Sequence, residues 1–319
     1  MTPSTVSTVD YHTAGEPFRI VTGGVDPLPG RTILEKRRYA LEQLDDIRCL
    51  LVFEPRGHAD MYGCFVVEPD DESADLGVVF FHNAGYSTAC GHGTIALVTW
   101  AVESGVVAEQ GPETRVVVDV PSGRLETWAS VEDGHVRSVR FRNVPAYVEE
   151  RGLRAAGRTV DLAFGGAFYA SLEERVEPPE LPRLIELGRR IKADLDEQRE
   201  FVHPLEPELR GVYGVIFWQR EQDGPPVVQR NVTVFADGEV DRSPCGSGTS
   251  ARLALLDLEG ELLHRSIVGS EFRARIVERR ELAGRPAVVT EVEGSAHLTG
   301  RHEFVLEPDD ELGTGFLLR

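Results

Sequence analysis

Two short segments of the sequence combine a cysteine with glycines in the same order. Cys90–Thr94 reads CGHGT and Cys245–Thr249 reads CGSGT, 155 residues apart, and each precedes an apolar run typical of a helix. The first turn of a helix has unpaired N–H groups and a partly positive end, which stabilise a thiolate and attract a carboxylate. The pattern predicts two reactive cysteines, each with a lowered pKa, beside backbone amides that can hold an anion.

Two such turns facing one cavity would place their sulfurs on opposite faces of an amino acid's α-carbon. One cysteine could then remove the α-proton and the other could return one, without a metal or an organic cofactor. The only two lysines, Lys36 and Lys192, lie in charged stretches that we expect to be solvated, so a pyridoxal phosphate Schiff base is not expected. Cys90 and His92 do not have a usual zinc spacing, and we therefore expect no metal site.

The other cysteines, the net charge and the distribution of apolar residues exclude several classes of protein. Cys49 and Cys64 lie in apolar, strand-like runs and are expected to be small buried side chains. The chain has 319 residues and a formal net charge of −19, which disfavours binding to nucleic acid or to anionic membranes. It has no apolar run of about 20 residues and no signal-like N-terminus, so a cytoplasmic location is expected.

Short β-branched runs outnumber the helical patterns, which predicts a strand-dominated α+β fold. The expected strands include 49–53, 64–67, 115–120 and 212–218, and the expected helices are 36–46, 94–104, 181–198 and 250–259. The repeated cysteine turn indicates two similar halves, 1–143 carrying Cys90 and 144–319 carrying Cys245. The joint is expected near 143–147, and the C-terminal strand is free to return to the first half.

Four segments in this order resemble the proline racemase family, which includes proline racemases, 4-hydroxyproline 2-epimerases and trans-3-hydroxy-L-proline dehydratases. They are Asp10–Arg19, Arg56–Gly63, Cys90–Gly93 and Asp241–Arg252. The resemblance implies a diaminopimelate-epimerase-like fold of two α+β halves with the active site in the cleft between them. It also implies that the two cysteines are the acid and the base. The implied substrate-binding residues are Gly91, His92, Gly246 and Ser247 at the carboxylate and Asp241 at the ring nitrogen.

Several positions allow a structural interpretation beside the functional one. His92 can contact the carboxylate through its ring or supply only its backbone amide, and Asp241 can instead cap the turn before Pro244. The segments 12–17 and 56–60 are expected to support the cavity rather than to react. Three aromatic residues can form an apolar wall around a pyrrolidine ring or belong to the core: Tyr62, Phe80 and Phe235.

The first functional hypothesis is a cofactor-independent isomerase that inverts the α-carbon of proline or hydroxyproline, such as a hydroxyproline epimerase. The alternative is a trans-3-hydroxy-L-proline dehydratase with Cys90 as base. Dehydratases of the family usually have threonine at the second cysteine, so Cys245 favours inversion, whereas Gly85–Thr88 and Phe235–Asp237 are similar to the dehydratase branch. A non-enzymatic alternative is a thiol-based sensor. The expected partner is a small imino acid, and a homodimer is left open.

Overall fold

In a computed structural model, which describes residues 5–318, the chain forms two compact units. Unit 1 consists of the chain up to Val139 together with residues from Ser295 onward, and unit 2 is Arg140–Gly294. The C-terminal strand lies in unit 1 because β17 (Ala296–Val305) pairs antiparallel with β1 (Thr5–Thr13). The expected joint near 143–147 falls between the end of β7 (His135–Arg142) and the start of β8 (Ala146–Ala155).

Unit 1 is built on a sheet in the order β17-β1-β2-β3-β4-β5-β6. Two of its neighbouring strand pairs are parallel, and helices make both of those connections. The further elements are β2 (Glu16–Gly23), α1 (Ile33–Gln43), α2 (Asp45–Val52), β3 (Tyr62–Val67), β4 (Leu76–His82), α3 (Gly91–Glu103), β5 (Glu113–Val120) and β6 (Gly123–Glu132). The strand β7 (His135–Arg142) begins in unit 1 and ends in unit 2, which starts at Arg140.

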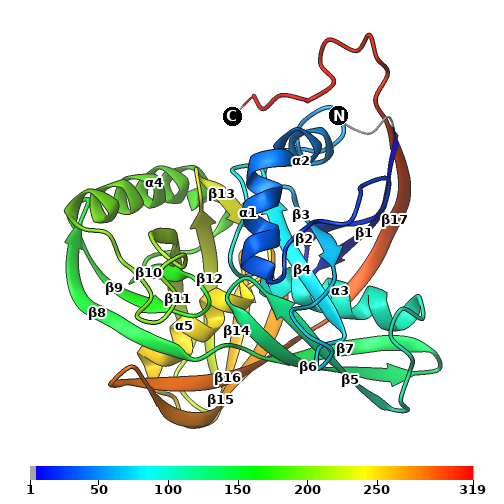
Figure 1. Cartoon of the computed structure of the whole chain (residues 1–319). Helices are drawn as coiled ribbons and strands as arrows, with labels where there is room; N and C mark the ends of the chain where they lie inside the picture. Colours follow the sequence, from blue (N-terminus) through cyan, green and yellow to red (C-terminus); the bar gives the residue numbers. More distant parts are fainter. Residues whose placement is uncertain (1–4, 319) are drawn as a thin grey trace. The chain divides into compact units, whose positions relative to one another are not determined.

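Unit 2 is a sheet that closes on itself around α5 (Figure 1). Its order is β8-β9-β10-β11-β12-β14-β15-β16, and β16 pairs again with β8 through Ala287–Tyr147 and Val288–Ala146. Its elements are β8 (Ala146–Ala155), β9 (Arg158–Phe164), β10 (Phe168–Glu173), the 3-10 turn Pro178–Glu180, α4 (Leu181–Gln198), β11 (Val212–Gln222), β12 (Val227–Phe235), β13 (Glu239–Asp241), α5 (Gly246–Leu256), β14 (Glu261–Ser266), β15 (Glu271–Leu282) and β16 (Arg285–Gly294).

The two units repeat one order of connections, as the duplicated cysteine turn predicts. In unit 1 a helical segment joins β2 to the parallel β3, β3 pairs antiparallel with β4, and α3 joins β4 to the parallel β5. In unit 2 α4 joins β10 to the parallel β11, β11 pairs antiparallel with β12, and α5 leads from β12 to the parallel β14. The prediction of two similar strand-rich α+β halves is therefore confirmed.

The helices that follow the two cysteines are buried on nearly all sides. Every residue of α5 except Leu256 is buried, and in α3 only Trp100 and Glu103 are not. A helix that is apolar all round needs protein on every side, and the surrounding sheet provides it. None of the helices within residues 5–318 is both long enough and apolar enough to cross a bilayer.

Two expectations about local structure are wrong. Residues 49–53 do not form a strand, because Cys49–Val52 is the end of α2, where Ile47, Leu50 and Leu51 place apolar side chains on one helical face. Lys36 is not solvated either: it is 3% exposed, and its Nζ donates a hydrogen bond to the carbonyl oxygen of Glu68 at 2.9 Å. A long aliphatic stem lets a lysine be buried while its charge meets a carbonyl.

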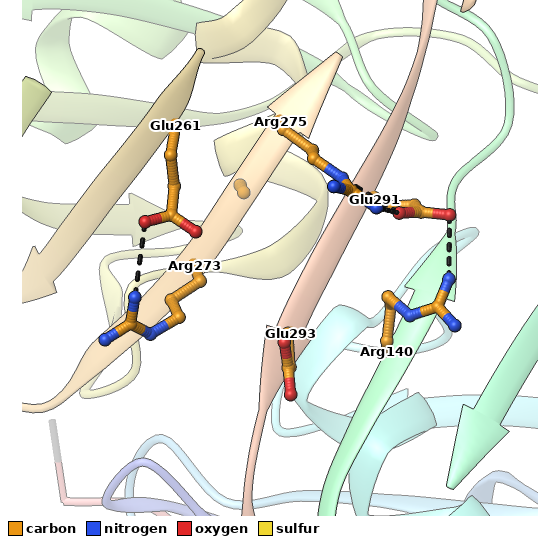
Figure 2. Close-up of a pocket in the computed structure, with 7 residues that line it drawn as sticks. Arg140, Glu261, Arg273, Arg275, Glu291 and Glu293 are labelled. Atoms are coloured by element: carbon orange, nitrogen blue, oxygen red, sulfur yellow. Dashed lines mark hydrogen bonds and ion pairs between the residues drawn. The ribbon is translucent and has the colours of Figure 1, made fainter. Parts of the chain in front are cut away.

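A buried carboxylate ties β16 to its neighbours in unit 2. Glu291 is 3% exposed and accepts from Arg140 at 2.9 Å, from Arg142 at 3.0 Å and from Arg275 at 2.7 Å. Figure 2 shows Arg140 and Arg275 reaching it in a pocket of about 200 Å³, which Arg273, paired with Glu261, also lines. The pocket contains none of the predicted site residues, and its charges are largely paired with one another.

Glu291→Gln is expected to destabilise unit 2 by about 1–2 kcal/mol at neutral pH, since it leaves three half-exposed arginines without their carboxylate. Burial alone raises the pKa of Glu291, but the hydrogen bonds and charges of its arginines outweigh burial and lower it. Stability from a lowered pKa is present above the unfolded-state pKa and is lost as the pH falls through the folded-state value. Thermal unfolding of wild type and variant should therefore converge on acidification; a constant difference would contradict the assignment.

Candidate active site

Cys90 is the N-cap of α3. Its backbone is extended (φ −152°, ψ 98°), and its Sγ accepts a hydrogen bond from the Gly93 N–H at 3.3 Å. The hydroxyl of Thr94 donates to the carbonyl oxygen of Cys90 at 2.8 Å and fixes the same turn. The sulfur thus lies against the backbone N–H groups of the first helical turn, where the helix dipole favours negative charge.

His92 packs its ring against the sulfur of Cys90. The two ring nitrogens lie 3.5 and 3.6 Å from Sγ, and the ring packs edge-on against Tyr62 at 4.9 Å and Phe18 at 5.6 Å between centroids. Burial lowers the pKa of His92 to about 3, so the imidazole is neutral at pH 7. A neutral imidazole can donate to a thiolate or accept from a thiol, a use of the ring that the sequence did not predict.

The motif at the start of the chain supports this turn, as expected. Thr13, the last residue of β1, donates its hydroxyl hydrogen to the backbone oxygen of His92 at 2.8 Å. Asp10 and Arg19 form a buried ion pair at 2.7 Å between β1 and β2. The first contact joins the hairpin of β1 and β2 to the start of α3, and the second joins the two strands of the hairpin to each other.

Cys245 is the N-cap of α5 and has an unusual backbone. Its φ of +63° lies in the left-handed region, which a residue with a side chain adopts at a cost of roughly 1–3 kcal/mol. The turn before it is held by two hydrogen bonds, from the Cys245 N–H to Ser243 Oγ at 3.1 Å and from the Ser243 N–H to Asp241 Oδ1 at 2.8 Å. Asp241 therefore does have the capping contact that the sequence offered as its structural role.

The thiol of Cys245 keeps its proton at neutral pH. Burial and the nearby Asp241 carboxylate raise its pKa to about 12, against the smaller lowering effect of the Gly248 N–H and the Thr233 and Tyr169 hydroxyls. Burial likewise raises the pKa of Asp241 to about 6. The expectation of a lowered pKa at Cys245 is therefore wrong, because loss of water around the sulfur outweighs the polar groups that face it. In this form Cys245 is a proton donor.

A buried tyrosine completes the surroundings of Cys245. The hydroxyl of Tyr169, on β10, lies 2.7 Å from Ser247 Oγ and 3.8 Å from Cys245 Sγ. No local sequence pattern marks this residue, because an aromatic residue in a strand-like run is usually core and Ser247 is 78 residues away.

The third residue after each cysteine has no room for a side chain. A Cβ on Gly93 would lie 2.7 Å from Cys90 Sγ, and one on Gly248 would lie 2.9 Å from Cys245 Sγ. Each glycine thus lets the sulfur settle on the first turn of its helix. The two units therefore share the geometry of the cysteine turn as well as its sequence.

The predicted site residues form two groups. Cys90, Gly91 and His92 lie together at the start of α3 in unit 1. Asp241, Cys245, Gly246 and Ser247 lie together at the end of β13 and the start of α5 in unit 2. Of the aromatic candidates, Tyr62 contacts the His92 ring, Phe80 packs against Phe18, and Phe235 stacks on Tyr213.

Comparison with known proteins identifies the family. The proline racemase family model matches residues 8–317. The chain is 42% identical to trans-3-hydroxy-L-proline dehydratase of Bacillus cereus and 44% identical to 3-hydroxyproline 2-epimerase of Burkholderia multivorans, with 98% of both chains covered in each comparison. The crystal structure of a hydroxyproline epimerase from Agrobacterium vitis, with bound trans-4-hydroxy-L-proline, superposes with a TM-score of 0.91 at 33% identity, covering 99% of this chain and 96% of that one. This chain is therefore an enzyme of the proline racemase family, as its four sequence motifs predict.

Proposed function

We propose that this enzyme inverts the α-carbon of a hydroxyproline with two cysteines and no cofactor. One sulfur, as thiolate, removes the α-proton, and the other, as thiol, protonates the opposite face. The observation that supports this most is the matched pair of turns, in which Cys90 and Cys245 each cap a buried helix and each require a glycine three residues later.

The remaining residues have roles that suit such a substrate. The first-turn amides of α3 and α5, beginning at Gly91 and Gly246, would hold the carboxylate and stabilise the charge that develops when the α-proton leaves. Ser247 would add a hydroxyl donor to the same group. Asp241, buried and with its pKa raised to about 6, gains a partner in the positively charged ring nitrogen.

We propose a 3-hydroxyproline as the substrate, because the Bacillus and Burkholderia relatives are both named for activity on that compound. Elimination of water is the second candidate reaction, and the name of the Bacillus relative favours it. In that reaction a cysteine takes the α-proton, the C3–O bond breaks, a ring double bond forms, and the hydroxyl leaves as water after protonation. Inversion and elimination share the first proton abstraction, so one pair of thiols can begin either reaction.

We place the enzyme in the cytoplasm. All four cysteines, Cys49, Cys64, Cys90 and Cys245, are free thiols in the structure. A mechanism that needs one thiol and one thiolate suits a reducing compartment, where a disulfide between them would not persist.

The test is NMR in deuterium oxide with proline, 4-hydroxyproline and 3-hydroxyproline, using protein dialysed against a strong chelator. We expect deuterium at the α-carbon and formation of the opposite α-configuration, with the ring hydroxyl retained. Loss of the hydroxyl without inversion would replace inversion by dehydration. No α-exchange with any of the three would reject the proposal and favour a thiol-based sensor. Activity that disappears after dialysis and returns with added zinc would contradict the cofactor-free mechanism.

A further inference from the structure

The hydroxyl of Tyr169 is a polar group that the reaction scheme leaves without a role. Tyr169 is 1% exposed, and its hydroxyl meets two groups, Ser247 Oγ at 2.7 Å and Cys245 Sγ at 3.8 Å. Both partners belong to the α5 turn and both have roles in the proposed reaction. A phenol carries one hydrogen to donate and lone pairs that accept, so the direction of each contact depends on its partner's protonation.

The two protonation states of Cys245 demand opposite arrangements of these hydrogens. When Cys245 is a thiol, its S–H can donate to the Tyr169 oxygen, and Tyr169 then donates its own hydrogen to Ser247. When Cys245 is a thiolate, Tyr169 can donate to the sulfur, and Ser247 donates to Tyr169. Each of the two contacts therefore has a donor and an acceptor in both states, which matters because an unpaired polar group at this depth is costly.

We propose that Tyr169 is a positioning residue that serves Cys245 as both thiol and thiolate by reversing its hydrogen bonds with Cys245 and Ser247. This inference rests on the proposed function, in which each sulfur must be an acid in one direction of the reaction and a base in the other. Tyr169 keeps its proton throughout and transfers none to the substrate. The device also couples Ser247, the proposed carboxylate donor, to the protonation of the sulfur next to it.

The other groups around the sulfur do not share this combination of contacts. Asp241, from β13, disfavours the thiolate by its charge and can accept the S–H hydrogen of the thiol, whereas the Gly248 N–H can only donate and so favours the thiolate. The Thr233 hydroxyl faces the sulfur from β12, and the Tyr213 phenol lies edge-on to Tyr169 from β11, with 5.7 Å between ring centroids. The hydroxyl of Tyr169, by contrast, contacts both Cys245 and Ser247.

Two substitutions should move the ionisation of Cys245 in opposite directions. Tyr169→Phe removes a donor to the thiolate and is expected to raise the pKa of Cys245 by about one unit, which slows its alkylation about tenfold at a fixed pH. Ser247→Ala leaves the Tyr169 hydrogen without its second acceptor, so ionisation of Cys245 becomes more favourable. Alkylation should then accelerate by a similar factor. A purely structural role would not produce shifts of opposite sign.

The measurement is iodoacetamide labelling without substrate between about pH 7 and pH 10, with each cysteine followed by peptide mass spectrometry. Cys90, labelled in the same sample, is the reference thiol in unit 1, and thermal unfolding followed by circular dichroism reports whether unit 2 of the variant remains folded. Tyr147→Phe is the matched control, because Tyr147 is also 1% exposed in unit 2 and its hydroxyl has no hydrogen-bond partner among the described residues. Its labelling at Cys245 should match the wild type.

Opposite shifts support the role of Tyr169. Shifts of one sign, no shift, or an equal effect of Tyr147→Phe would overturn it. The result is separate from the proposed function, which depends on α-proton exchange in the wild type. Opposite shifts in a protein that exchanges no α-proton would retain the hydrogen-bond device and reject the inversion reaction.

Discussion

Cys245→Ser is expected to reduce inversion at least about a thousandfold in both directions. A serine hydroxyl has a far higher pKa than a thiol, so it is a poor base on one face of the substrate, and the proton returned from that face is lost. Exchange of the α-proton with solvent should survive in the direction in which Cys90 is the base. Circular dichroism of the imino acid follows inversion, and deuterium incorporation measured by mass spectrometry follows exchange.

Cys49→Ser is the matched control for this variant, because Cys49 lies on α2 in unit 1 and has no part in the proposed reaction. It should retain wild-type rates. A Cys245→Ser enzyme that still dehydrates trans-3-hydroxy-L-proline, when the wild type inverts no imino acid, would establish the one-base dehydratase. A variant that inverts at the wild-type rate would exclude Cys245 from the reaction.

The second large effect is expected at the two glycines under the sulfurs. An alanine methyl at Gly248 would lie 2.9 Å from Cys245 Sγ, and at Gly93 it would lie 2.7 Å from Cys90 Sγ and 2.3 Å from a ring carbon of Phe18. Relief of such overlap requires the sulfur or the helix to move. Overpacking of this kind costs roughly 1–3 kcal/mol of stability. A displaced sulfur is expected to lower kcat by more than about a hundredfold, because proton abstraction depends strongly on position.

The control for both substitutions is Gly224→Ala, since a Cβ at Gly224 would meet nothing within 4 Å. Steady-state kinetics and thermal unfolding should both remain unchanged in that variant. Wild-type kcat in Gly93→Ala or Gly248→Ala would show that the sulfur above that glycine does not need its present position.

Local patterns are sufficient to predict the longest helix and several strands of the two units. The expected helix 181–198 coincides with α4, whose buried Leu184, Leu187, Ile191 and Leu195 recur at helical spacing. The expected strands 64–67, 115–120 and 212–218 lie within β3, β5 and β11. Helices were expected to begin at Thr94 and Ser250, but α3 and α5 begin directly after their cysteines. Glycine disfavours a helix interior, yet in these first turns it is required by the sulfur.

Properties that depend on distant residues were not predictable. A short apolar run such as 49–53 fits a strand or a buried helix equally well, and only packing decides between them. Lys36 is buried because a carbonyl oxygen of Glu68, 32 residues away, accepts its charge. The raised pKa of Cys245 depends on how completely the closed sheet removes water from the sulfur, and Tyr169 reaches that sulfur from a strand 76 residues earlier in the chain.

The pairing of β1 with β17 has a consequence for synthesis of the protein. Thr5 is opposite Val305 in that pair, so β1 cannot pair with β17 until the ribosome has made all of the chain between them. Unit 2 is continuous in sequence, and all its strands have been made by Gly294. Domains fold as their chain becomes complete. We therefore expect the unit that carries Cys245 to fold first, whereas the unit that carries Cys90 cannot be completed until β17, which follows unit 2 in the chain, has also been made.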